Sequence, residues 1–405
     1  VDWRTAEIDH YREVRNLLGG SYYLAPANYA SDFWTEAEHE RGLGDRVGYD
    51  NSNTVDWFGF FGQAEYSLGR LTAYGMAGYS TINYTYTDHF KDDGTGNEFV
   101  LESDNIGGYQ AKGGALYNIT DKLGAYGNVG YVSKVPIFDA VIDDINGVFS
   151  ENPENEKFTS LEAGLNWFSN KLTAKVSYYY TLWNDRAISR GITLADGSSS
   201  LIFITGMDQL HMGLEFEGAY QPINWFRFDL AGSVGNWNYI DDVTGRYKDY
   251  DNPEQPDVTY DYYIKDLKVG DAPQTQVAVG ASLFPLKGLF VQGTYRYYTS
   301  HYANFDPQTR TDETDRIQSW SAPSYGVIDL HARYKLPFTI GGLGLSLFGH
   351  VFNALDEVYV QDAVDNSAYS AYRVDKVIVN PHMADAAEVF LGLPRTFNVG
   401  LQLNY

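Results

Sequence analysis

Few residues of this chain have the types and spacing that chemistry requires, and three of them share one face of a predicted strand. His211, Glu215 and Glu217 alternate with apolar residues, and an imidazole with two carboxylates could ligate a metal ion. A polar strand face that meets water explains the same residues, and we prefer that interpretation. The sequence has no His-Glu-x-x-His motif and no phosphate-binding glycine loop, and residues 231–235 lack the first glycine of a nucleophile elbow. We therefore expect neither an enzyme nor a cofactor.

The elements that must position such residues are long strands with a period of two. The final segment, 396–405, alternates polar and apolar residues without an error and ends on Tyr405. Similar alternation runs through residues 172–182, 211–220, 226–234, 275–283, 289–298 and 325–335. Soluble strands average about 5 to 6 residues, whereas a tilted strand needs roughly 9 to 11 to cross a bilayer. The length of these segments predicts membrane-spanning strands.

The connections between the predicted strands alternate between two lengths. Short turns lie at residues 68–70, 119–122, 169–171, 221–224, 285–288 and 337–342. Long polar or irregular segments lie at residues 7–53, 91–103, 135–156, 187–206, 242–270, 304–322 and 354–391. Outer-membrane barrels have short periplasmic turns opposite long external loops, whereas a soluble sandwich or propeller has no reason to separate the two so strictly. This asymmetry favours a transmembrane antiparallel β-barrel.

About fourteen strands fit between these connections. They are residues 1–6, 54–67, 71–89, 104–118, 123–134, 158–168, 172–185, 207–220, 225–240, 272–284, 289–302, 323–335, 343–353 and 394–405. We interpret residues 1–405 as a single barrel domain. The first strand is a stub that leads into a long loop, so we expect the chain to begin partway along a hairpin. An open barrel would leave unpaired backbone groups in hydrocarbon, so other strands must complete it.

One segment has helical rather than strand spacing. Apolar residues recur through residues 6–18 at Ile8, Tyr11, Val14, Leu17 and Leu18. This spacing predicts a short loop helix that ends at Gly19-Gly20.

Composition supports the barrel and excludes other classes. The chain has 34 Tyr, 22 Phe and 8 Trp, as expected where two aromatic girdles sit at the membrane boundaries. The formal charge of −24 excludes nucleic-acid binding. Acidic loops such as residues 249–266 keep the surface soluble, or bridge a divalent cation. The absence of cysteine fits an envelope protein, and no signal peptide opens the chain, so we expect a mature, processed or incomplete sequence.

At this point several segments resemble one known family, the TonB-dependent receptors of Gram-negative outer membranes. Residues 392–396 (Gly-Leu-Pro-Arg-Thr), with the strand that ends at Tyr405, resemble the family's terminal signature and its aromatic barrel-assembly signal. Residues 351–359 (Val-Phe-Asn-Ala-Leu-Asp-Glu-Val-Tyr) resemble its Asn-Leu-Phe-Asp-x-x-Tyr element. Residues 325–330 are similar to the strand before that element, and residues 152–157 resemble a segment that opens a mid-barrel strand.

The resemblance implies a barrel of 22 strands around an N-terminal plug, of which this chain would be the C-terminal part. The plug, the peptide that engages the TonB complex and about eight strands are then expected to be absent from this sequence. The implied location is the outer membrane, in contact with lipopolysaccharide. The implied activity is active import of a small molecule or oligosaccharide. A ferric siderophore, cobalamin and a glycan are the candidate classes.

Strand direction places a set of candidate ligand-binding residues at the outward end of the lumen. They are Trp183, His211, Trp237, Tyr239, Arg296, Tyr298 and Tyr325. Aromatic faces with one cation and one imidazole suit an anionic, ring-bearing or sugar-like ligand. Girdle and loop-packing roles explain the same aromatic residues, so both interpretations stay open. Other inward charges, among them Arg227, Asp229 and His331, are expected to form salt bridges or to contact the plug.

Two further functional interpretations remain open. A receptor-like barrel can serve as a structural anchor or a surface-assembly subunit without transport. A complete porin of about fourteen strands is the other alternative, and the half-hairpin start argues against it. A plug encoded upstream would support import.

Overall fold

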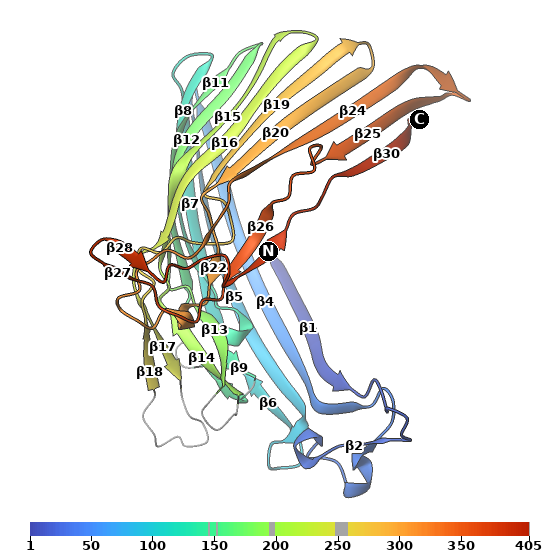
Figure 1. Ribbon diagram of the computed structural model, residues 1–405, viewed down its shortest axis with the longest axis vertical. Coiled ribbons are helices and arrows are strands. Elements are labelled where there is room, and N and C mark those ends of the chain that lie inside the picture. Colours follow the sequence, from blue (N-terminus) through green and yellow to red (C-terminus); the bar gives the residue numbers. More distant parts are fainter. Residues whose placement is uncertain (145, 151–152, 194–198, 248–257, 405) are drawn as a thin grey trace.

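Fourteen strands pair in chain order to form one strongly curved antiparallel sheet (Figure 1). The computed structural model describes residues 1–144, 146–150, 153–193, 199–247 and 258–404. The first seven strands are β1 (Asp2–Glu13), β4 (Arg46–Leu68), β5 (Leu71–Asp92), β7 (Ile106–Asn118), β8 (Leu123–Lys134), β11 (Glu156–Phe168) and β12 (Leu172–Asn184). The others are β15 (Gln209–Ile223), β16 (Phe226–Tyr239), β19 (Thr275–Leu286), β20 (Leu289–Thr299), β24 (Tyr325–Ile340), β25 (Leu343–Phe352) and β30 (Thr396–Asn404). A short strand, β6 (Glu98–Glu102), pairs with the end of β5. The predicted strand number, order and all-β class are confirmed.

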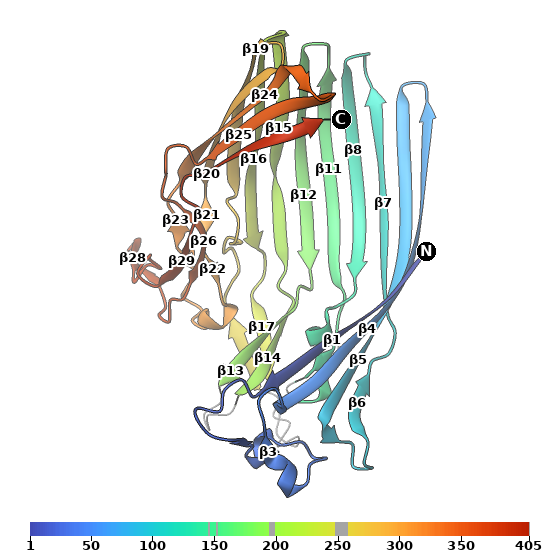
Figure 2. The same cartoon turned by 90° about the vertical axis from the view of Figure 1, so that its right-hand side faces the viewer.

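The two ends of the sheet differ as the sequence predicts. At one end, turns of two to four residues join neighbouring strands, for example residues 69–70 between β4 and β5 and 119–122 between β7 and β8. Gly69 and Gly288 adopt positive φ angles of 59° and 90° in these turns, a conformation that glycine reaches without a Cβ penalty. The described parts of the long connections gather at the opposite end (Figures 1 and 2).

The long connections carry small sheets of their own. Two-stranded sheets are β2 (Tyr23–Leu24) with β3 (Glu40–Arg41), β9 (Ile142–Asp143) with β10 (Val148–Phe149), β21 (His301–Tyr302) with β23 (Ser321–Ala322), and β27 (Tyr372–Val374) with β28 (Val377–Val379). β13 (Ile188–Thr193), β14 (Ser199–Thr205), β17 (Val243–Tyr247) and β18 (Val258–Tyr262) form a sheet that joins two successive loops. β22 (Asn304–Phe305), β26 (Val360–Asp365) and β29 (Ala387–Leu391) join the last two loops. The 3-10 helices of the described residues are η1 (Ala27–Tyr29), η2 (Glu36–His39), η3 (Phe138–Ala140) and η4 (Pro307–Thr309).

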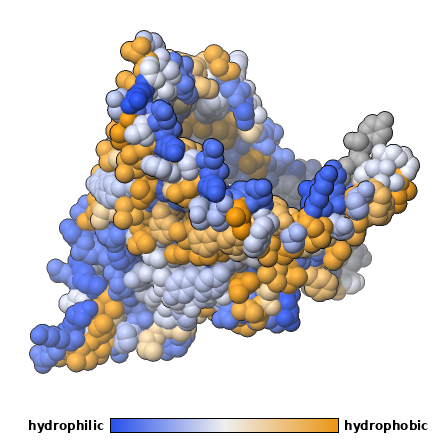
Figure 3. All heavy atoms as spheres, turned by 90° about the horizontal axis from the view of Figure 1, so that it is seen from above, coloured by the Kyte–Doolittle hydropathy of each residue, from blue (hydrophilic) through white to orange (hydrophobic). Residues whose placement is uncertain are grey.

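Strand register gives the sheet one polar and one apolar face. On β12 and β15, Lys175 lies opposite Glu217 and Thr181 lies opposite His211, all on the concave inner face. Val176 and Leu214 lie on the outer face, where they are 45% and 52% exposed. Hydrophobic side chains cover broad areas of the outside when the molecule is seen from the end with the short turns (Figure 3). An outer surface of exposed apolar side chains is what a lipid-facing sheet requires.

Buried apolar residues gather in the loops and in the strand ends that lead into them. The largest buried cluster contains Ile202, Ile204, Met207, Tyr239, Val243, Tyr262, Ile264, Leu267 and Phe305. Smaller clusters lie around Tyr84 with Ile142 and around Val14 with Val47. The loops therefore have hydrophobic cores of their own, which hold them in a defined arrangement at the end of the sheet.

The predicted helix over residues 6–18 is wrong. Residues 6–13 continue the first strand, so that β1 has 12 residues and pairs with β4 from Asp2 opposite Gly59 to Glu13 opposite Arg46, and residues 14–18 lie in the connection that follows. Pairing with β4 satisfies the backbone groups along one edge of this strand, and this outweighs a local spacing that was compatible with a helix. Gly19, at φ 87°, belongs to the turn that follows, where the Gly20 N–H donates to the carbonyl of Leu17.

The two edge strands of the sheet are β1 and β30. Within the described residues, β1 pairs only with β4 and β30 only with β25, so the sheet is not closed. The edges leave rows of backbone donors and acceptors without strand partners, and in hydrocarbon each such group costs several kcal/mol. Among the described residues, no helix has the length and apolar character to cross a membrane.

Candidate ligand-binding face

The seven predicted binding residues lie on the inner face, near the ends of the strands that lead into the long loops. Register places Trp183 and Tyr239 on either side of Gln209, and His211 directly opposite Trp237. On the other side of β19, Tyr298 lies opposite Tyr325, and Arg296 is two residues before Tyr298 on the same face of β20. The structure thus divides the set into two groups, separated by β19.

The first group is held by hydrogen bonds to its neighbours. The ring of His211 lies 5.5 Å from that of Trp237, and His211 Nε2 lies 3.0 Å from Gln209 Oε1. The indole N–H of Trp237 donates to the hydroxyl of Tyr179 at 2.8 Å. Gln274 accepts the backbone N–H of Trp237 at 3.0 Å. These contacts fix the orientation of both rings and leave their faces half exposed on the inner side.

Trp183 and Tyr239 belong to this end of the face but differ in exposure. Trp183 packs against Phe158, with ring centroids 4.8 Å apart, and the Arg186 guanidinium lies 5.0 Å from its ring. Tyr239 is only 4% exposed, and its ring meets Phe305 edge-on in the largest loop cluster. Tyr239 therefore packs the loops against the sheet, whereas Trp183 borders the open face.

The second group is an aromatic stack beside an ion pair. Tyr298 and Tyr325 have ring centroids 5.0 Å apart, and Tyr325 stacks on Tyr359 at 4.4 Å with an interplanar angle of 20°. Arg296 forms an ion pair with Asp329 and remains 41% exposed, while the Asp329 side chain is 4% exposed. Asp329 also accepts the backbone N–H of Asn353 at 2.9 Å. The buried carboxylate holds the guanidinium at the surface of the inner face.

Tyr359 was not among the predicted residues. It comes from the connection that follows β25, and only the tertiary fold brings it onto Tyr325. Its place in the Asn-Leu-Phe-Asp-x-x-Tyr-like element, residues 351–359, was a signal that this tyrosine has a structural or binding role.

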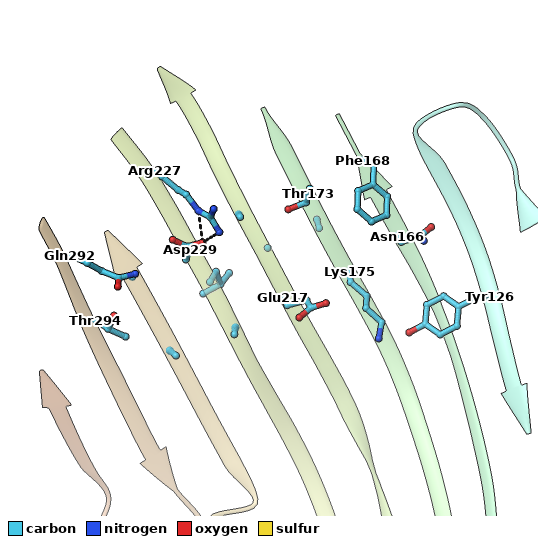
Figure 4. A pocket seen from close by; sticks show the side chains of 17 residues that line it. Tyr126, Asn166, Phe168, Thr173, Lys175, Glu217, Arg227, Asp229, Gln292 and Thr294 are labelled. Carbon is cyan, nitrogen blue, oxygen red and sulfur yellow. Dashed lines mark hydrogen bonds and ion pairs between the residues drawn. The ribbon is translucent and has the colours of Figure 1, made fainter. Parts of the chain in front are cut away.

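Toward the short-turn end, the inner face carries a wide cavity of about 590 Å³ (Figure 4). Its charged lining residues include Lys175, Glu217, Arg227 and Asp229. Arg227 donates to Asp229 at 2.6 Å, and Lys175 lies 3.4 Å from Glu162. The prediction that inward charges form salt bridges is confirmed for these pairs. Because the cationic groups are matched by carboxylates, this region offers no excess charge to an anionic ligand.

The less favoured interpretation of His211, Glu215 and Glu217 as a metal site has no support in the geometry. Within the residues that the structure describes, no three His, Cys, Asp or Glu side chains group closely enough to hold a metal ion. His211 instead contacts Gln209 and Trp237. Tyr405, the predicted assembly signal, lies outside the described residues.

In the long connections beyond the second group, a buried set of charged residues joins the last two loops. We call Arg310, Asp315, Asp365 and His382 the loop ion cluster. The Arg310 and Asp315 side chains are each 1% exposed and 3.2 Å apart, and His382 Nε2 lies 3.0 Å from Asp315. Asp365 lies 3.7 Å from both Arg310 and His382. The cluster binds residues that are up to 72 positions apart in sequence.

The electrostatics of the loop ion cluster follow from its burial. Burial lowers the pKa of Arg310 and outweighs the opposing effect of Asp315 and Asp365. Burial alone would raise the pKa of Asp315, but the hydrogen bond with His382 and the charge of Arg310 outweigh it, so that the pKa is lowered. Asp315 is therefore a carboxylate at neutral pH, and it depends on the hydrogen bond with His382 and on the charge of Arg310.

Comparison with known proteins agrees with this architecture. The family described as "TonB dependent receptor-like, beta-barrel" matches residues 2–354. No curated protein matches the chain. Among solved structures, the copper transporter OprC has a TM-score of 0.54 at 15% identity over 92% of this chain and 51% of its own. The ferric citrate transporter FecA has a TM-score of 0.54 at 13% identity, over 90% of this chain and 47% of its own.

A third solved structure, the ferric yersiniabactin uptake receptor FyuA from Yersinia pestis, has a TM-score of 0.55 at 15% identity over 87% of this chain and 46% of its own. The chain spans about half the length of these structures. At such identities the likeness establishes the fold, while the family match extends over most of the chain. Residues 2–354 carry the β-barrel pattern of one family, and the chain belongs to the TonB-dependent receptors.

Proposed function

We propose that this protein is an outer-membrane receptor that imports a large, scarce nutrient with energy from the TonB complex. The observation that carries the proposal is the row of oriented aromatic rings and an exposed guanidinium at the loop end of the inner face. Trp237 and the Tyr298–Tyr325–Tyr359 stack present aromatic rings, and Arg296 presents a cation. A ligand that enters from the side of the long loops meets these groups first.

The chemistry of this face favours an anionic or ring-bearing ligand. Aromatic faces bind planar rings and sugars, and a guanidinium donates paired hydrogen bonds to carboxylates. A ferric siderophore, cobalamin or a glycan would supply such groups. Asp329 already pairs with part of the Arg296 guanidinium, so a ligand carboxylate would bind the exposed side of that guanidinium.

The same proposal includes the parts that an import cycle needs. The open edges β1 and β30 require partner strands in the membrane, so we propose that further strands close the barrel. An N-terminal plug would then fill the lumen and contact the paired charges of the inner cavity, and it would transmit the action of the TonB complex. Lipopolysaccharide would surround the outer face.

The test is uptake by cells whose only receptor of this type is the wild-type protein or a variant. Radioactive iron in citrate and catecholate chelates, labelled cobalamin and labelled oligosaccharides serve as the probes. Arg296→Ala should lower the uptake of one of these probes about tenfold or more, since a hydrogen bond to a charged group contributes about 1.5 to 3 kcal/mol. Trp237→Ala should also lower it, because the variant removes a ring face on which the ligand packs. Arg70→Ala, which removes an exposed arginine of the short turn between β4 and β5, at the opposite end of the sheet from the site, is the matched control and should leave uptake unchanged.

Removal of the TonB protein from the same cells separates import from the alternative functions. Active import should stop completely without TonB. Uptake that persists would indicate a passive pore, and the absence of uptake for every probe, with normal protein levels, would favour the structural anchor. Equal uptake by wild type, Trp237→Ala and Arg296→Ala would contradict the proposed binding site but not the proposal of active import.

A further inference from the structure

Two histidines outside the proposed ligand site meet on the inner face of the sheet. His331 of β24 and His350 of β25 occupy directly opposite positions in the register. Their Nδ1 atoms are 2.7 Å apart, and the ring centroids are 4.9 Å apart. Opposite side chains of an antiparallel pair have Cβ atoms about 4.5 to 5.5 Å apart, so the paired backbones hold the two imidazoles together.

The distance between the two Nδ1 atoms determines whether they can share a proton or a metal ion. At hydrogen-bond distance one Nδ1–H donates to the lone pair of the other Nδ1. If the donor ring carries its proton on Nε2 instead, both Nδ1 lone pairs converge on one point. A metal–nitrogen bond of about 2.0 to 2.1 Å places two ligand nitrogens roughly 2.9 to 3.4 Å apart. The rings would need to separate by less than about 1 Å.

We propose that His331 and His350 form a binding site for a divalent transition-metal ion of the kind that prefers imidazole, such as Cu²⁺, Ni²⁺ or Zn²⁺. Neutral imidazole is a ligand that suits these ions, whereas Mg²⁺ and Ca²⁺ prefer oxygen. Only the tautomer of one ring changes when the ion binds, and no oxidant or other reactant is required.

The surroundings supply further donors and restrict water. Gln292 on β20 lies opposite His331, and Asn398 on β30 lies opposite His350, so residues with amide side chains occupy the register positions on both sides of the pair. Phe352 meets the His331 ring edge-on at 5.6 Å, and Phe348 lies 5.6 Å from His350. Apolar neighbours of this kind limit the access of water and strengthen coordination.

The arginine side chains near the histidine pair interact with other residues. Arg333 is two residues from His331 on the same face and donates to Gln402 at 2.9 Å. Arg296 is paired with Asp329. These cations therefore have partners that draw them away from the two imidazoles, and the pair remains able to accept an ion.

The experiment uses the protein extracted from membranes into detergent and purified without a polyhistidine tag. Titration with CuSO₄, NiSO₄ and ZnSO₄ alone, followed by calorimetry, measures affinity and stoichiometry. With Cu²⁺, electron paramagnetic resonance counts the coordinated nitrogens. The variants are His331→Gln and His350→Gln, and His39→Gln in the loop helix η2 is the matched control. Circular dichroism establishes that every variant is folded.

We expect one ion per chain with two coordinated nitrogens in the wild type and in His39→Gln. Each variant of the pair should bind at least about tenfold more weakly, because the loss of a direct ligand costs no less than the loss of an outer-shell partner. Equal affinity in a folded His331→Gln/His350→Gln double variant would overturn the proposal, as would a wild type that binds none of the three ions. The readout does not depend on transport, so it is independent of the proposed function.

Discussion

Substitution of Arg310 by Met tests whether buried charges hold the last two loops together. The change removes the cation but keeps most of the side-chain volume, so Asp315 and Asp365 remain buried, each about 1% exposed. Removal of one partner from a buried ion pair costs about 3 to 5 kcal/mol, because the other charge is left uncompensated. The loops can relax and let water reach the carboxylates, so we expect a cost at the lower end of this range, about 3 kcal/mol.

Hydrogen exchange measures this cost directly. Two backbone amides report on the loop ion cluster, since Ala371 N–H donates to Asp315 at 3.1 Å and Trp320 N–H donates to Asp365 at 3.2 Å. A loss of about 3 kcal/mol raises the population of the open loop roughly 100-fold, so exchange at both amides should accelerate by that factor. Strand amides of β12 should keep their protection.

The matched control is Arg316→Met. Arg316 also forms an ion pair between two loops, with Asp242 at 2.6 Å, but these side chains are 37% and 35% exposed. Exposed pairs contribute about 0 to 1 kcal/mol, so exchange should change less than about fivefold. In Arg310→Met, neutralisation of the carboxylates with Asp315→Asn and Asp365→Asn should restore part of the protection. Equal exchange in Arg310→Met and Arg316→Met would refute the reasoning.

Two other predictions concern pH and the membrane face. Burial lowers the pKa of His301 and outweighs the opposing effect of Asp362 and Asp271. The unfolded imidazole, with a pKa of about 6.5, therefore takes up a proton first, and loop stability should be complete above that pH and fall below it. Protease cleavage within residues 300–324 should be faster at about pH 5.5 than at about pH 7.5, and His301→Gln should abolish the difference; a pH-independent rate in the wild type would contradict this. On the outer face, Val176→Arg should destabilise the folded protein by about 2 to 4 kcal/mol in lipid vesicles. Ala231→Arg, which lies on the inner face, should cost much less in urea unfolding; equal costs would mean that the faces are assigned incorrectly.

The strands and short turns were predictable because their signals are local. Alternation along residues 172–182 and 396–404 fixes which side chains share a face, and the turns with Gly69 and Gly288 carry residues that suit positive φ. The first strand was predicted to end too early because the spacing of Ile8 and Tyr11 fits two conformations. Only the pairing of β1 with β4 decides between them.

The site was predictable in part for the same reason. Strand direction placed Trp237 and Arg296 at the loop end of the inner face, and the structure has them there. Contacts that depend on register or on loop folding were not predictable. His331 was expected to face inward, but its contact with His350 requires the register of β24 and β25. Tyr359 required the path of a long connection.

The distribution of buried residues shows that two different solvents stabilise the two halves of this fold. The sheet exposes Val176, Leu214 and similar side chains on its outer face, so lipid replaces the second packing layer that a soluble sheet would need. The loops lie in water and must bury their own apolar groups, which is why Ile204 and Leu267 are almost completely inaccessible there. We therefore expect loop opening and barrel unfolding to be separable events.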